Sequence, residues 1–166
     1  MPNKKTLPQF NRTHISRLDF EEAESYLRIL NPAWHGMVID NEHIRRALLT
    51  AAIVAYSRPF SGNKGHPNAV GHPPLDVQKV LKGDSKYIEL HDNILKLRNT
   101  AIAHSDFDAK PVAEYKAIQD GFKVKEERFD VLSKQIDVDR FLGLCSSMRG
   151  YCSDKQFELS NQINGQ

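Results

Sequence analysis

Residues 98–106, with the sequence RNTAIAHSD, contain three side chains that can act together on a phosphate group. Arg98 can bind a phosphate through two parallel hydrogen bonds and stabilise the negative charge that develops on it. Asn99 follows directly and can help to orient the same group. His104 can donate or accept a proton near neutral pH. These residue types suit acid–base chemistry at a phosphate group.

The spacing of Arg98 and His104 sets a geometric condition on that chemistry. Six residues along a helix rise about 9 Å and turn about 600°, so the two side chains lie roughly 120° apart around the axis. Either the helix ends near Ala103 and His104 turns toward Arg98, or a second copy of the chain completes the site. A structural interpretation also stays open, in which Arg98 is a solvated helix residue and His104 caps a helix C-terminus.

The string Arg98-Asn99-x4-His104 resembles the Arg-polar-x4-6-His motif of the HEPN superfamily. The resemblance covers about residues 16–105 and 137–159, and this motif is its specific element. It implies a homodimeric, metal-independent endoribonuclease whose two protomers pair along the motif helix and share a cleft. It also implies a role in defence or stress, for example as the toxin of a toxin–antitoxin pair.

Two alternatives to the ribonuclease hypothesis remain. The first is a non-catalytic HEPN-like module that binds a nucleotide, RNA or an antitoxin of the nucleotidyltransferase type. The second is a helical interaction protein in which the motif is accidental. The first alternative and the ribonuclease differ in whether Arg98 and His104 converge in one exposed cleft.

Three further residues are candidate substrate contacts. Arg58 and Lys64 lie in the Pro- and Gly-rich stretch 57–74, which is longer than an ordinary loop. They can supply phosphate contacts beside the main site, or simply belong to a surface loop. His91 comes seven residues before Arg98, on nearly the same helix stripe, and is either an auxiliary site residue or a structural histidine.

No metal or cofactor is expected. His66 and His72 have no cysteine nearby and no carboxylate before Asp76, so they do not form a zinc pattern. The chain also contains no glycine-rich phosphate loop followed by Lys and Ser or Thr.

Apolar residues recur at helical spacing in the segments that must position these residues. They predict long helices at about 16–30, 41–56, 84–103 and 137–159, with a short helix at 75–81. The second half of 41–56 is apolar nearly all round, which is typical of a central buried helix. The helix 84–103 carries two apolar strips, which favours contact both with its own core and with a second copy.

The dipeptide Asp120-Gly121 lies between the runs 112–119 and 122–129, a pattern typical of a type I′ β-hairpin. An isolated hairpin is marginally stable in water, so we expect its apolar face to pack on the helices. The predicted fold is therefore mainly α, a HEPN-like helical bundle with a small β-hairpin inserted before the last helix. One domain spans 1–166, with flexible ends at 1–12 and 160–166.

Composition agrees with a globular protein of one domain. The chain has 166 residues, 40% of them hydrophobic and 27% charged, with a formal net charge of +2. That net charge is compatible with nucleic-acid binding through a local basic patch, but it does not indicate such binding. Cys145 and Cys152 lie seven residues apart on a predicted helix. Their Cα atoms are therefore about 10.5 Å apart, which is too far for a disulfide. Free thiols, with no secretory signal and no membrane span, favour the cytoplasm.

Overall fold

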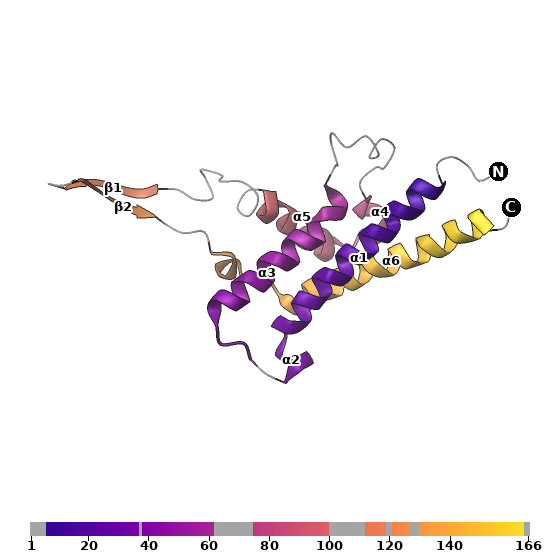
Figure 1. Cartoon of the computed structure of the whole chain (residues 1–166), viewed down its shortest axis with the longest axis horizontal. Coiled ribbons are helices and arrows are strands. Elements are labelled where there is room, and N and C mark those ends of the chain that lie inside the picture. Colours follow the sequence, from indigo (N-terminus) through magenta and orange to yellow (C-terminus); the bar gives the residue numbers. More distant parts are fainter. Residues whose placement is uncertain are drawn as a thin grey trace.

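A computed structural model describes residues 6–36, 38–61, 75–99, 112–118, 121–126 and 130–164 of the chain. Three long helices, α1 (Thr6–Leu30), α3 (Glu42–Ser57) and α6 (Val138–Asn164), form its body (Figure 1). The shorter elements are α2 (Pro32–His35), η1 (Arg58–Phe60), α4 (Val77–Leu81), α5 (Ser85–Leu97), β1 (Val112–Ile118), β2 (Gly121–Glu126) and η4 (Val131–Lys134). The structure is mainly helical, as the apolar periodicity predicted.

Helices α1 and α6 lie side by side along most of their length and run antiparallel (Figure 1). Polar contacts show the direction, since residues late in α6 meet residues early in α1. Gln156 bonds to His14, and Ser146 donates to Glu24 at 3.1 Å. At the far end Asn31 donates to Asp139. This antiparallel seam fixes which side chains of the two helices can meet.

Aromatic rings hold the centre of the bundle together. Tyr56 of α3 lies at ring-centroid distances of 5.6 Å from Phe20 of α1 and 5.3 Å from Phe141 of α6. Phe60 packs on Tyr56 at 5.4 Å. All three long helices therefore meet at Tyr56, which is fully buried. The second half of α3 is central and buried, as its apolar composition predicted.

Side-chain caps set where several helices begin. Asn41 accepts hydrogen bonds from the backbone N–H groups of His43 and Ile44, so α3 starts where the sequence predicted. Asp84 caps α5 in the same way, through Lys86 and Tyr87. The start of α5 predicted at Asp84 or Ser85 is confirmed.

The helices extend into both ends of the chain that were predicted to be flexible. The arm was expected over 1–12, yet α1 begins at Thr6. Pro8 is tolerated there because the N–H groups of a first helical turn have no acceptor within the helix. The tail 160–166 was also expected to be loose, but α6 continues to Asn164 beyond the buried Leu159.

The strands β1 and β2 pair antiparallel, with Tyr115 opposite Val124 and Ala117 opposite Phe122. The turn residues 119–120 lie outside the described residues. We expected the hairpin to pack on the helices, but within the described residues β1 and β2 form no broad contact with any helix (Figure 1). The expected packing of the hairpin on the helices is therefore not found among the described residues. No helix in the described ranges is both long and apolar enough to cross a membrane.

Candidate functional site

Arg98 and Asn99 lie at the C-terminal end of α5. The backbone N–H of Arg98 donates to the carbonyls of Ile94 and Leu95, and the helix then widens into a π-type turn at residues 98–99. Such turns are frequent at functional sites. The end of this helix had been predicted near Ala103, which lies outside the described residues together with His104. Whether Arg98 and His104 converge therefore stays a prediction.

The side chains of Arg98 and Asn99 bind each other. Nη1 of Arg98 donates to Oδ1 of Asn99 at 2.9 Å, at an exposed position. Within the described ranges, no carboxylate lies within ion-pair distance of the Arg98 guanidinium. Among the described residues, Asn99 thus orients the guanidinium without neutralising its charge.

His91 is a core residue in this structure. Its side chain is 3% exposed, its Nδ1 lies 2.8 Å from the hydroxyl of Tyr56, and its ring packs edge-on against Phe60 at 4.5 Å. Burial lowers the pKa of His91 from its usual value, which favours the neutral imidazole. These contacts correspond to the structural alternative. They correct the hypothesis of a substrate contact, because packing on Tyr56 and Phe60 places His91 in the core, while Arg98 lies about 10.5 Å further along the helix axis.

Arg58 is already bound by two carboxylates of α1. Its Nη1 lies 2.5 Å from Glu22 and 3.3 Å from Asp19. Burial raises the pKa of Asp19, and the hydrogen bond and charge of Arg58 oppose that rise. Arg58 therefore links η1 to α1, and a phosphate would have to compete with both carboxylates. Lys64, the other predicted contact of this stretch, lies outside the described residues.

Both cysteines lie in the core. Cys145 and Cys152 are fully buried. Burial raises the pKa of Cys152 to about 12 and that of Cys145 well above its usual value. Neither thiol is therefore a nucleophile at neutral pH. In the described part of the chain, no three His, Cys, Asp or Glu residues are grouped so that they could hold a metal ion.

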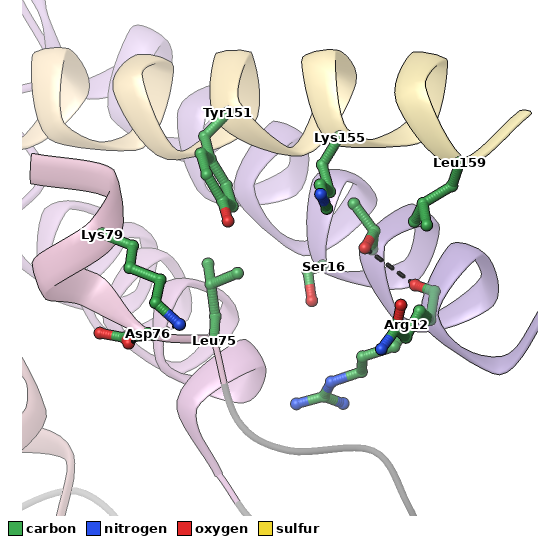
Figure 2. Close-up of a pocket in the computed structure, with 10 residues that line it drawn as sticks. Arg12, Ser16, Leu75, Asp76, Lys79, Tyr151, Lys155 and Leu159 are labelled. Carbon is green, nitrogen blue, oxygen red and sulfur yellow. Dashed lines mark hydrogen bonds and ion pairs between the residues drawn. The ribbon is translucent and has the colours of Figure 1, made fainter. Parts of the chain in front are cut away.

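Sequence reasoning missed a groove of about 340 Å³ between α1, α4 and α6 (Figure 2). Arg12, Lys79 and Lys155 line it together with Tyr151 and Asp76. These residues come from three separate parts of the chain, so no local pattern connects them. The one available signal was Arg12, which interrupts an otherwise uncharged helix start but had been assigned to a loose arm.

Comparison with known proteins gave no match among family models, curated proteins or solved structures. The resemblance to HEPN proteins therefore depends on the sequence motif and on the helical context.

Proposed function

We propose that this chain is a metal-independent endoribonuclease of the HEPN type, with its active site shared across a homodimer. The observation that carries the proposal is the Arg98–Asn99 pair at the end of α5. There the guanidinium is oriented by a 2.9 Å hydrogen bond, and no described carboxylate pairs with it. A cation held in this way suits the binding of a scissile phosphate.

In the proposed mechanism His104 carries the proton transfers. It removes a proton from the 2′-OH of the RNA or supplies one to the leaving 5′-oxygen, and Arg98 stabilises the charge on the pentacovalent phosphate. The 2′-oxygen forms a bond to phosphorus while the bond to the 5′-oxygen breaks. The products are a 2′,3′-cyclic phosphate and a 5′-hydroxyl. Asn99 is a positioning residue that acts through Arg98.

The packing of α5 supports the homodimer. Only His91 and Ile94 of this helix are fully buried. The apolar side chains of Ile88, Leu95 and Leu97 remain partly exposed within one protomer. A second copy packed along α5 would remove this apolar area from water, which stabilises an interface by about 25 cal/mol per Å². The same pairing would bring His104 of one protomer toward Arg98 of the other.

The biological setting that follows is a cytoplasmic toxin or defence protein, held inactive by an antitoxin partner until needed. Of the open alternatives, a non-catalytic binding module would keep the same fold without the proton transfer. Catalysis is therefore the property to measure first.

The test is cleavage of a 5′-labelled single-stranded RNA by the purified chain and its variants. His104→Ala should lower the rate by about 10²–10⁴ and Arg98→Ala by about 10²–10³. Asn99→Ala should cost less, because it leaves the charge of Arg98 in place. End-group analysis should find the cyclic phosphate.

Matched controls come from α3, where His43 and Arg45 are both exposed. His43→Ala and Arg45→Ala should cleave at the rate of the unmodified protein. Circular dichroism should show the same helical signal in every variant. Equal rates in both motif variants, or no cleavage by the unmodified protein, would remove the ribonuclease proposal in favour of the binding module.

A further inference from the structure

Three basic side chains from three helices surround the groove between α1, α4 and α6. Arg12 comes from α1, Lys79 from α4 and Lys155 from α6. Figure 2 shows their charged groups around one opening, with the hydroxyls of Ser16 and Tyr151 among them. Among the described residues that line the groove, three carry a positive charge and Asp76 carries the negative one. The electrostatic balance therefore favours an anion.

The carboxylates near these lysines are weak competitors. Nζ of Lys79 lies 3.4 Å from Asp76, and both side chains are at least half exposed. Asp76 also caps α4 through the N–H of Gln78. Nζ of Lys155 lies 2.6 Å from Glu158, which is 58% exposed and lies on the same helix. Exposed ion pairs contribute little to stability, so an anion in the groove can compete for both ammonium groups.

Arg12 is more firmly held and has an unused donor. Its Nη2 donates to the carbonyl of Pro59 at 2.7 Å, which fixes the guanidinium at the edge of the groove. Its Nε is buried and has no acceptor among the described residues. A buried donor without an acceptor costs free energy, but this atom has no accessible surface, so Arg12 contributes to the groove through the charge of its guanidinium. Asp19 interacts with Arg12 through its charge, but its hydrogen-bond partner is Arg58.

Part of the remaining surface of the groove is apolar, and Gln9, Thr13 and Ser16 add polar groups to it. Leu75, Leu159 and the ring of Tyr151 line it beside the charged groups. Its volume of about 340 Å³ is at the small end of ligand pockets, which are usually 300–1,000 Å³. The apolar part of the lining suits a ligand that carries a small organic group beside its phosphate.

We propose that this groove binds a phosphomonoester no larger than a mononucleotide. The phosphate lies among Arg12, Lys79 and Lys155, and the organic group lies on Tyr151 and the two leucines. This ligand site is distinct from the Arg98 motif and requires no ribonuclease activity.

The test is isothermal titration calorimetry of the full chain at low salt, with adenosine monophosphate and inorganic phosphate as probes. We expect adenosine monophosphate to bind more tightly than phosphate, and added salt to weaken both. Lys79→Met and Lys155→Met should each weaken binding about three- to tenfold, since each removes one charge-assisted contact from an exposed position. Lys86→Met removes the same charge from an exposed position on α5 and should change nothing.

Several results would overturn the proposal. These are no binding of either probe at millimolar concentration, equal affinity for the two probes, or unchanged affinity in both groove variants at an unchanged melting temperature. Binding of an RNA oligonucleotide that depends on Lys79 and Lys155, without binding of adenosine monophosphate, would assign the groove to RNA instead. Arg98→Ala should retain adenosine monophosphate binding, so this test and the ribonuclease test fail independently.

Discussion

Replacing Glu24 by glutamine should measure what the α1–α6 seam contributes to stability. Glu24 is the buried carboxylate of the described residues, with 5% of its side chain exposed. It accepts hydrogen bonds from Nε of Arg149 at 2.8 Å, from Ser146 at 3.1 Å and from Nη2 of Arg28 at 3.2 Å. The variant Glu24→Gln removes the charge from this cluster and keeps the shape of the side chain.

The expected decrease in the free energy of unfolding depends on how exposed the two arginine partners of Glu24 are. Breaking a fully buried ion pair costs about 3–5 kcal/mol, because one charge is left unpaired away from water. Arg28 and Arg149 are 33% and 37% exposed, so water can recover part of their solvation. The glutamine carbonyl also keeps one acceptor. We therefore expect the free energy of unfolding to fall by about 2–3 kcal/mol. For a chain of this size that lowers the melting temperature by about 4–12 °C.

The assay is urea and thermal unfolding followed by circular dichroism, with Glu21→Gln as the matched control. Glu21 lies on the same helix and pairs with Arg17 at 3.0 Å, but it is 53% exposed. Removing the charge of Glu21 should lower the free energy of unfolding by at most about 0.5 kcal/mol. The reasoning is refuted if Glu24→Gln costs no more than Glu21→Gln.

Three further predictions follow from the core histidine and the proposed mechanism. Because burial lowers the pKa of His91, the unfolded chain binds more protons than the folded one just below pH 6.5. The free energy of unfolding should therefore fall as the pH drops through that range, by at most about 1.4 kcal/mol per pH unit, and urea melts of His91→Gln should show a smaller slope. RNA cleavage should proceed unchanged in EDTA, since the 2′-OH and His104 supply the nucleophile and the proton transfer; activity restored only by Mg²⁺ would contradict this. Light scattering at micromolar concentration should report about twice 18.9 kDa, whereas a monomer would count against the shared site.

Much of the helical architecture was predictable because its determinants are local. Apolar periodicity located α3, α5 and α6, and Asn41 and Asp84 marked two helix starts through bonds to backbone only two or three residues away. The position of Arg12 in the fold was not predictable in this way, because its contact is distant in sequence. Arg12 reaches the carbonyl of Pro59, 47 residues along the chain.

The sequence by itself determined which residues could do chemistry: an Arg-Asn pair, a histidine six residues after the arginine, and further cations nearby. Only the tertiary structure decided which of them are available. His91 and Arg98 lie on the same helix, yet packing against Tyr56 and Phe60 buries the first and leaves the second at the surface. The groove likewise exists only because the antiparallel α1–α6 seam brings together side chains remote in sequence. The reason is that spacing along one helix fixes relative angle, whereas burial and charge pairing depend on which faces of different helices meet.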